Sequence, residues 1–339
     1  MATNESYVVT SHNTLNYSGV LFAKGNGATP FISMIGNKSK RYAAWEFPMG
    51  VEYTIGGGSA QPAITETASL TAPNATKVAR TQTTNAAQIY QEQVAVSYAK
   101  KSSMGALSGI AIGGEYANPA NEEDFQIAAA IKKMRKDVEY TFLNGSFQRG
   151  TYDDVAWKTQ GITGAISTNA VAASSAALGY WLVASLVESI ATHDGDAENL
   201  VLMVRPENLM QLNADAQANG LTIVDSNRSV NGIRIKELQT PFGAIGVISN
   251  RFLASGTAVA VNPAVCFPVF VDVPGKGNFF VEDLAKTGAA DKKQLYGQVG
   301  LDYGAEWMHG KITGLATSFT APTYHNTVYV AGGTITTTT

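Results

Sequence analysis

The stretch NEEDFQIAAAIKKMRKDVEYTFLNG, residues 121–145, predicts one long helix. Asn121 takes the N-cap position, and the carboxylates of residues 122–124 lie at the positive end of the helix dipole. Gly145 supplies the left-handed residue that ends the helix. A helix of this length spans about 35 Å, which is long for a single domain.

The apolar residues of this helix are spaced by three and four, so they form a single stripe. This spine stripe consists of Ile127, Ile131, Met134, Val138 and Phe142. Two ion pairs, Lys133 with Asp137 and Arg135 with Glu139, are expected on the solvent-facing side. One stripe indicates a helix that lies across another layer of structure rather than inside a core.

The composition combines ordinary hydrophobicity with a shortage of charge. Charged residues are 15% and hydrophobic residues 45% of the chain, against about 25% charged residues in a typical soluble protein. Such a chain either has unusually large neutral surfaces or hides much of its surface against partners. The second interpretation is favoured, because neutral surfaces associate. The net charge of −3 is no general signature of polyanion binding. The basic residues within 132–136 are interpreted as a solvated face, with a weak nucleic-acid contact as the minority alternative.

Neither cysteine usage nor apolar runs indicate a secreted or membrane protein. Cys266, the single cysteine, is interpreted as a small buried hydrophobe and permits no internal disulfide. The N-terminal run MATNESYVVTSHN lacks the basic and apolar regions of a signal peptide. The apolar run at residues 171–191 has serines and Glu188 opposite a leucine face, which favours a soluble amphipathic helix at residues 174–193 over a membrane span. No membrane contact is expected.

The order of elements along the chain is uncommon. Residues 1–40 predict an irregular arm punctuated by Gly and Pro. Strand-like runs at residues 41–55 and 88–100 flank a stretch rich in turn residues, and they are expected to pair as a long hairpin. An isolated two-stranded ribbon is marginal in water, so this hairpin needs another surface to lie on. The remaining pattern predicts a helix ending at Gly220, a buried strand in NLVLMVRP, strands over residues 232–273 and 278–315, and a Thr-rich tail.

No constellation of catalytic or metal-binding residues stands out. The four histidines have no partner at ligand spacing, which with one cysteine argues against a metal site. GNKS (36–39) and GKG (275–277) lack the spacing of a phosphate loop, and there is no Gly-x-Ser-x-Gly elbow. We therefore expect no enzyme activity, no catalytic residue, no cofactor and no metal.

Several stretches together resemble the Hong Kong 97-type fold of tailed-bacteriophage major capsid proteins, over nearly the whole chain. The arm is matched by ATPFISMIG (28–36), and the extended loop by RYAAWEFPMGVEY (41–53) and TQTTNAAQIYQEQVAVSYAKKSS (81–103). AAAIKKMRKDVEYTFLNG (128–145) is similar to the spine helix of the peripheral domain. The most specific stretches are GIRIKELQTPFGAIGVISNRFL (232–253), which resembles a strand–turn–strand of the axial domain, and VEDLAKTGAADKKQLYGQVGLDYGAEWMHGKITGL (281–315), which resembles the closing strands of the peripheral domain.

The resemblance implies an α+β fold made of successive segments. These are an N-terminal arm (1–40), an extended β-hairpin loop (41–100), a peripheral domain (101–170) with its spine helix (121–144), a mixed α/β axial domain (171–273), peripheral closing strands (274–318) and a C-terminal tail (319–339). The tail has no firm counterpart in the family. It is expected either to add a strand to a neighbour or to be disordered in isolation.

The resemblance also implies a structural function, self-assembly as hexamers and pentamers into the icosahedral head shell of a tailed double-stranded DNA phage. Axial domains are then expected to pack around five- and six-fold centres, while loop and arm lie across neighbouring subunits. Within the loop, the residues expected to contact a neighbour are Trp45, Phe47, Pro48, Val51, Tyr53 and Ile64. The spine stripe is expected to pack the long helix onto the wall of the shell.

Further partners follow from the same resemblance. They are a portal, a decoration protein and nonspecific contact of a few Lys and Arg side chains with packaged double-stranded DNA. Any scaffolding is expected to be a separate protein, because the chain starts almost at the arm. Lys77 and Lys100 lack a matching crosslinking motif, so no lysine–asparagine crosslink is expected. Assembly is expected in the host bacterial cytoplasm, and the assembled protein in the virion.

Two other classes of function compete with this interpretation. An encapsulin-like bacterial nanocompartment uses the same fold to enclose cargo enzymes instead of DNA, and neighbouring genes would distinguish the two. A soluble enzyme with an unrecognised site requires a stable small oligomer with a polar pocket.

Overall fold

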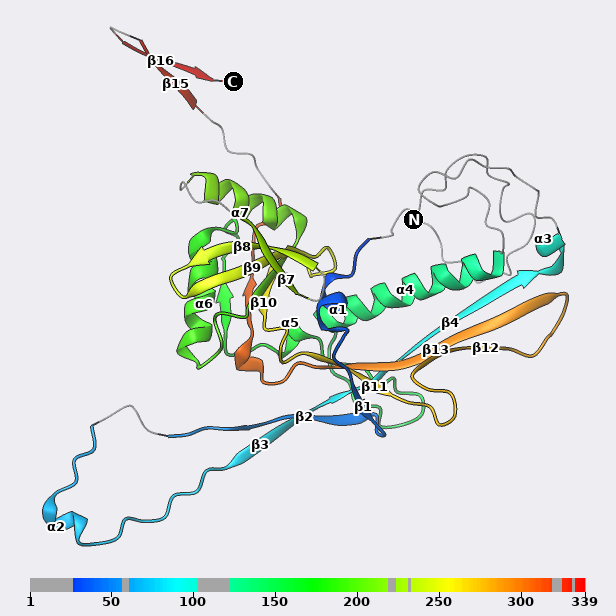
Figure 1. Ribbon diagram of the computed structural model, residues 1–339, viewed down its shortest axis with the longest axis horizontal. Coiled ribbons are helices and arrows are strands. Elements are labelled where there is room, and N and C mark those ends of the chain that lie inside the picture. Colours follow the sequence, from blue (N-terminus) through cyan, green and yellow to red (C-terminus); the bar gives the residue numbers. More distant parts are fainter. Residues whose placement is uncertain are drawn as a thin grey trace.

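Two β-sheets, a long helix that lies along one of them and a ribbon that leaves the body make up the fold (Figure 1). The computed structural model describes residues 27–56, 61–102, 122–218, 224–230, 233–318, 325–330 and 333–338. Its helices are α1 (Pro30–Ile35), α2 (Glu66–Ser69), α3 (Tyr98–Ser102), α4 (Glu122–Asn144), α5 (Ile162–Ala165), α6 (Tyr180–Thr192) and α7 (Pro206–Ala218), with a 3-10 turn η1 at Glu306–Met308. Its strands are β1 (Lys40–Tyr42), β2 (Glu46–Tyr53), β3 (Arg80–Ala86), β4 (Gln88–Ser97), β5 (Ala170–Ala172), β6 (Val201–Val204), β7 (Val224–Val230), β8 (Ile233–Thr240), β9 (Gly243–Ser249), β10 (Thr257–Val261), β11 (Phe267–Val271), β12 (Phe279–Asp283), β13 (Ala290–Asp302), β14 (Gly310–Thr313), β15 (His325–Val330) and β16 (Gly333–Thr338).

The five-stranded sheet is organised around the long strand β13. Along one edge of β13, β4 pairs antiparallel from Gln88 opposite Val299 to Ser97 opposite Ala290. Along the other edge, β11 and β12 follow each other end to end, and β1 pairs in parallel with β11. The predicted long helix is α4, which lies along β4 (Figure 1) and is tied to it by an ion pair between Lys133 and Glu92.

The seven-stranded sheet runs in the order β5-β14-β10-β6-β9-β8-β7, with parallel pairs β5–β14 and β6–β9. Helix α6 packs closely on β14. A β-carbon on Gly310 would lie 2.7 Å from Leu186 and 2.9 Å from Ile190, so glycine is what allows this approach. The residues of α6 that face the sheet are fully apolar, in agreement with the predicted amphipathic helix.

Strand β6 connects the two hydrophobic cores of the molecule. Leu202 and Val204 face the core formed with α6 and α7, whereas Val201 and Met203 face the core shared with α4 and the five-stranded sheet. Burial on both faces explains the continuous apolar run that predicted this strand, which is confirmed.

The predicted hairpin is wrong in its second strand. The ribbon that leaves the body pairs β2 with β3, whereas the run at residues 88–100 forms β4 and α3 and belongs to the five-stranded sheet. The extended loop is therefore residues 46–86 rather than 41–100. Alternation alone could not separate the two candidates, because both β3 and β4 can pair with an alternating strand and the true partner of β4 lies about 200 residues further along.

Two domain boundaries also change. β11, expected in the axial segment, pairs with β13 in the five-stranded sheet. β14, expected among the peripheral closing strands, pairs with β10 and β5 in the seven-stranded sheet. The chain thus crosses between the sheets more often than a division into consecutive segments allows.

The start of α6 and the ends of the chain differ from expectation as well. The helix expected from residue 174 begins at Tyr180, because Ser174 and Ser175 have left-handed backbones (φ 49° and 65°) and Asp215 accepts a hydrogen bond from the Tyr180 N–H (2.6 Å). In the tail, β15 and β16 pair with each other as an antiparallel hairpin. Asn121, Gly220 and the arm before residue 27 lie outside the described residues.

Helix α4 buries most, but not all, of its predicted stripe. Met134, Val138 and Phe142 are buried as expected, and Ile127 is partly buried against the same core. Ile131 is 51% exposed, so its assignment to the packed stripe is wrong within the subunit. The reason is that, among the described elements, α4 packs mainly on β4, and Ile131 lies at an open groove beside β11 and β12.

Glu139, expected in a solvent-facing ion pair, is fully buried. Its carboxylate accepts hydrogen bonds from the backbone N–H groups of Phe31 (2.9 Å) and Ile32 (2.8 Å) and from the Asn250 side chain (2.7 Å). Burial raises the pKa of Glu139, and these three hydrogen bonds act against that shift. The carboxylate thereby joins α4 to the start of α1 and to the end of β9, and Arg135 instead donates to Ser33 (2.7 Å).

A second buried titratable group is His309, which is 0% exposed beside Cys266. Its Nδ1 accepts from the Asn262 N–H (3.1 Å), and its Nε2 lies 2.7 Å from the carbonyl oxygen of Tyr303. This arrangement requires the neutral ring with the proton on Nε2. Burial lowers the pKa of His309 to about 4 and raises that of the Cys266 thiol.

We predict that Glu139→Gln loosens α1. The amide would place an N–H group against a donor, so a buried hydrogen bond is lost at about 1–3 kcal/mol. Hydrogen exchange at the Phe31 and Ile32 amides should accelerate. Asp137→Asn, an exposed carboxylate on the same helix, serves as the control and should leave both amides unchanged. Equal protection in both variants would show that Glu139 does not hold α1.

We also predict an acid-sensitive stability from His309. Between pH 6.5 and about 4 the unfolded chain binds a proton at this ring and the folded chain does not, so the free energy of unfolding falls on acidification by up to about 3 kcal/mol. Denaturant unfolding of the unassembled subunit across this range, compared with His309→Asn, isolates the contribution. The variant should have a lower free energy of unfolding at pH 7, and this free energy should change less with pH than in the wild type. If the free energies of both proteins fell in parallel on acidification, His309 would not be buried as a neutral ring.

Candidate assembly interface

The base of the extended loop (residues 46–86) is fixed to the body by side chains that alternate along β2. Phe47 is fully buried and stacks on Tyr42 with ring centroids 5.6 Å apart, and Met49 is 4% exposed in the same core. A β-carbon on Gly300 would lie 2.6 Å from the Phe47 ring, so this glycine makes the room that Phe47 occupies. The loop therefore leaves the body in a fixed direction.

Polar and aromatic contacts reinforce this base on the other face of β2. Glu46 forms an ion pair with Arg149 and accepts a hydrogen bond from the Thr84 hydroxyl (2.8 Å). The hydrogen bond from Arg149 is the main cause of the lowered pKa of Glu46. Trp45 lies against Trp157 with ring centroids 6.4 Å apart. These contacts belong to the subunit itself and hold the loop in place before any neighbour arrives.

Beyond this base the loop exposes its apolar side chains. The ladder between β2 and β3 shifts register between Pro48 and Val51, where Pro48 has no N–H to donate. From that point outward the large apolar side chains that the structure describes are at least half exposed: Val51 (54% exposed), Tyr53 (60%), Ile55 (75%), Ile64 (75%), Leu70 (84%) and Val78 (51%). Each such side chain gains about 1.5–3 kcal/mol when fully buried, which makes the outer loop a candidate contact surface.

The loop residues predicted to contact a neighbour thus divide into two groups. The predicted contact of Phe47 with a neighbour is wrong, because Phe47 is fully buried in its own subunit. Trp45 is half-buried and lies against Trp157. Pro48, Val51, Tyr53 and Ile64 are exposed, and their contact with a neighbour stays a prediction. Leu70, the most exposed of the loop's apolar side chains, was not predicted, although it follows Ile64 across the short helix α2.

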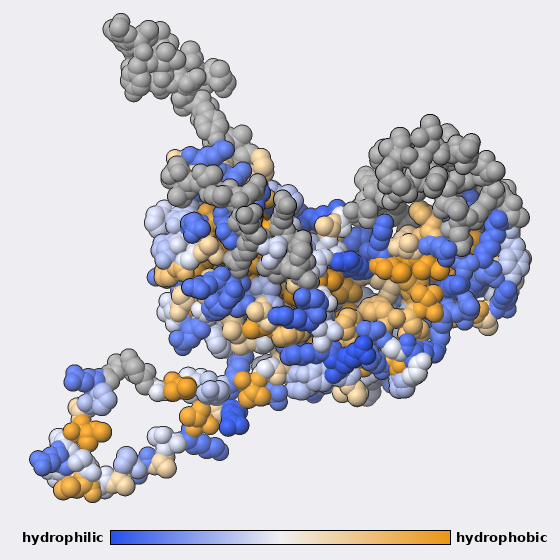
Figure 2. Space-filling view, viewed as in Figure 1, coloured by the Kyte–Doolittle hydropathy of each residue, from blue (hydrophilic) through white to orange (hydrophobic). Residues whose placement is uncertain are grey.

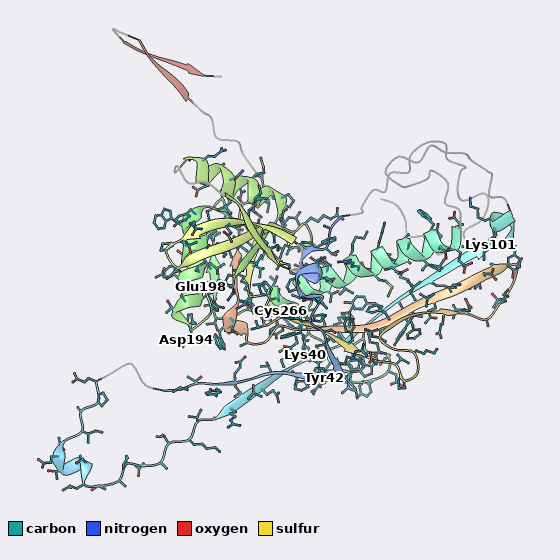
Figure 3. The ribbon with its side chains drawn as sticks, in the orientation of Figure 1. Lys40, Tyr42, Lys101, Asp194, Glu198 and Cys266 are labelled. Atoms are coloured by element: carbon teal, nitrogen blue, oxygen red, sulfur yellow. The ribbon has the colours of Figure 1, made fainter. Side chains whose placement is uncertain are left out.

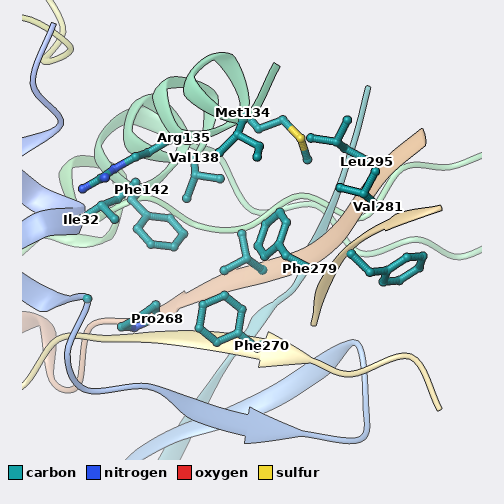
Figure 4. Close-up of a pocket in the computed structure, with 14 residues that line it drawn as sticks. Ile32, Met134, Arg135, Val138, Phe142, Pro268, Phe270, Phe279, Val281 and Leu295 are labelled. Atoms are coloured by element: carbon teal, nitrogen blue, oxygen red, sulfur yellow. The ribbon is translucent and has the colours of Figure 1, made fainter. Parts of the chain in front are cut away.

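A second uncovered apolar surface lies between α4 and the outer strands of the five-stranded sheet. This apolar groove has a volume of about 410 Å³ and is seen as a hydrophobic patch below α4 in Figure 2 and at close range in Figure 4. Ile131, Phe279 (42% exposed) and Val281 (44%) border it. Its walls come from α1, α4, β11, β12 and β13, with Met134, Val138, Phe142, Pro268, Phe270 and Leu295 among the lining residues.

Phe279 is held over β13 by a glycine and an aromatic neighbour. A β-carbon on Gly297 would lie 2.2 Å from the Phe279 ring, and Phe270 meets that ring edge-on with centroids 6.1 Å apart. The ring is thus pinned in a half-exposed position at the mouth of the groove (Figure 4). NFFVED (278–283) was predicted as a strand, but this surface was not predicted. The two adjacent phenylalanines were the feature that could have indicated it.

The described residues hold few features typical of other kinds of site. Within the described ranges, no three His, Cys, Asp or Glu side chains come together as a metal site. No helix in the described part of the chain is both long and apolar enough to cross a membrane. Hollows in the described part of the chain include the apolar groove, a second one of about 530 Å³ beside Trp45 and Trp157, and a third beside α1.

Comparisons with solved structures identify the fold. The chain is similar to the holo-SrpI encapsulin complex from Synechococcus elongatus PCC 7942, with a TM-score of 0.61, 9% identity and coverage of 92% of this chain and 97% of that chain. It is similar to the cyanophage A-1(L) capsid, with a TM-score of 0.60, 12% identity and coverage of 89% and 96%. For the capsid of Myoviridae phage XM1 the TM-score is 0.56, the identity 14% and the coverage 92% and 100%. These likenesses show the α+β Hong Kong 97-type fold.

Sequence comparison assigns the family. A comparison with curated proteins finds no match to the sequence. The profile of the SU10 major capsid protein family matches residues 3–316. The likeness to an encapsulin is therefore one of fold, and family and fold together point to a structural rather than an enzymatic role. The chain belongs to the SU10 major capsid protein family and is a capsid shell protein of a tailed bacteriophage.

Proposed function

We propose that the subunits assemble by placing the outer extended loop of one copy on the body of the next. The observation that carries this proposal is the row of exposed apolar side chains on a loop whose base is rigidly anchored in its own subunit. The loop tip with α2 projects away from the body and from α4 (Figure 1), while the apolar groove lies between α4 and strands β11 to β13. The tip therefore cannot fold back to cover its own groove.

A loop on one side and an acceptor surface on the other make a heterologous contact. Such contacts close into rings when the rotation allows it. We propose that the rings are hexamers and pentamers, and that they tile into an icosahedral head around double-stranded DNA. The body built on the seven-stranded sheet corresponds to the axial domain at the ring centre, and the body built on the five-stranded sheet and α4 corresponds to the peripheral domain. In each neighbour the apolar groove receives an apolar segment.

The wider setting of this function follows the same proposal. Assembly takes place in the host bacterial cytoplasm, with a portal and with separate scaffolding or decoration proteins as further partners. Contact with the packaged DNA is nonspecific. The protein needs no catalytic residue, because ring closure and tiling are driven by burial of surface.

We predict that Tyr53→Ser, Ile64→Ser and Leu70→Ser combined abolish shells without unfolding the subunit. All three side chains are exposed, so thermal unfolding of the unassembled chain should change little. Negative-stain electron microscopy, under conditions in which the wild type closes shells, should show only small species. Thr67→Ser with Thr71→Ser is the control in the same loop. Normal shells from the triple variant would refute the loop contact, and Phe47→Ser should instead unfold the subunit.

We also predict that a charge in the apolar groove disrupts assembly. Ile131→Asp places a carboxylate where an apolar segment is proposed to dock, at a position 51% exposed in the subunit. Phe125→Asp is the matched control, because Phe125 is 39% exposed on the same helix but does not line the groove. Shell yield by size-exclusion chromatography should fall for Ile131→Asp only. Equal yields would mean that the groove stays open in the shell.

A further inference from the structure

A basic cleft lies beside α1 on the flank of α4. It has a volume of about 390 Å³ and is lined by Gly27, Ala28, Thr29, Ser33, Lys132, Arg135 and Lys136. Three of these residues are cations of α4 at spacings of three and four, Lys132, Arg135 and Lys136, which places them on one face of the helix. A fourth, Arg251, approaches from the seven-stranded sheet, since a β-carbon on Gly27 would lie 2.4 Å from its guanidinium carbon. Four cations thus gather around the short segment that leads into α1.

The hydroxyl groups in the cleft are held in position. Ser33 donates to the carbonyl oxygen of Thr29 (2.8 Å) and accepts from Arg135 (2.7 Å). Arg135 is therefore oriented by the wall of the cleft, while the side chain of Lys132 is exposed. No acidic or large apolar side chain is among the described residues that line the cleft. This chemistry suits an anion with several oxygens rather than an apolar or cationic ligand.

Two carboxylates of α4, Glu139 and Asp137, lie close to these cations but do not line the cleft. Glu139 is buried and accepts three hydrogen bonds on the far side of α1. Glu92 pairs with Lys133, the remaining cation of the cluster, which points to β4 and away from the cleft. Asp137 interacts with Lys133 and Lys136 from the neighbouring position of α4. The described lining of the cleft thus holds three cations and no carboxylate, although the whole chain carries a net charge of −3.

We propose that the basic cleft contacts backbone phosphates of the packaged DNA, so that the flank of α4 beside α1 faces the interior of the shell. This inference rests on the proposed function, in which the shell encloses double-stranded DNA. Phosphates are the one dense array of anions that the inner wall would meet. These cations line a cleft and are not presented on a helix or strand that could enter a DNA groove. The contact is therefore with the backbone, is independent of DNA sequence and acts through release of counterions.

Salt dependence of DNA binding tests the proposal. A labelled short duplex is titrated with the purified full-length subunit at several salt concentrations, and the slope of log K against log[salt] is measured by fluorescence anisotropy. Lys132→Gln with Lys136→Gln removes two phosphate contacts, so the slope should become shallower by about 1.8. Lys38→Gln with Lys77→Gln removes the same charge at exposed positions away from the cleft and should alter the slope far less.

Two outcomes would overturn the proposal. If both double variants change the slope equally, the cleft is no preferred DNA contact. If the cleft variant keeps the wild-type slope but fails to close shells, the cations serve an acidic surface of a neighbouring subunit instead. Millimolar inorganic phosphate that displaces the duplex at constant ionic strength would mark a site for free phosphate, and this too counts against DNA. Because binding is measured on unassembled subunits, the result is independent of whether the loop contact builds the shell.

Discussion

The buried carboxylate of Glu139 is the constraint on which the arrangement of the subunit depends. A carboxylate with no exposure to water has to be satisfied by hydrogen bonds, and its donors come from two other parts of the chain, the start of α1 and Asn250 at the end of β9. Helix α4, the arm and the seven-stranded sheet therefore meet at one point with fixed geometry. Since α1 forms a wall of both the apolar groove and the basic cleft, the shape of both surfaces follows from this point.

The subunit combines well-packed cores with apolar surfaces that stay exposed to water. Its two cores share β6, whose side chains are buried on both faces, and the base of the loop is closed by Phe47 and the pair of Glu46 with Arg149. The outer loop and the groove, in contrast, leave apolar area in water. This division suits a protein that has to fold before it assembles, because the surfaces buried late are not needed for the cores. The proposed contacts would also account for the low fraction of charged residues, since they would cover much of the surface.

Elements that depend on local patterns could be predicted from the sequence, and those that depend on distant partners could not. Helix α4 and strand β6 were predicted because capping residues and apolar spacing lie within the element itself. The assignment of β4 to the hairpin failed because its partner β13 is chosen by the tertiary fold. Glu139 was predicted to lie on the surface, because a glutamate one helical turn from an arginine usually forms a solvated ion pair. Nothing in the local sequence indicates that backbone donors of α1 approach it.

Helix α4 presents several faces with different contacts, and not only the single apolar stripe that was predicted. Val138 and Phe142 enter the core, Glu139 faces the arm, Lys133 faces β4, and Ile131 faces the open groove. A helix inside a globular domain needs only one buried face, because water covers the rest. A helix in a thin wall is contacted from its own sheet, from a neighbouring copy and from the enclosed space. A sequence that looks like an ordinary amphipathic helix can make all of these contacts only if some of its apolar and charged side chains stay exposed in the subunit, as Ile131 and Lys132 do.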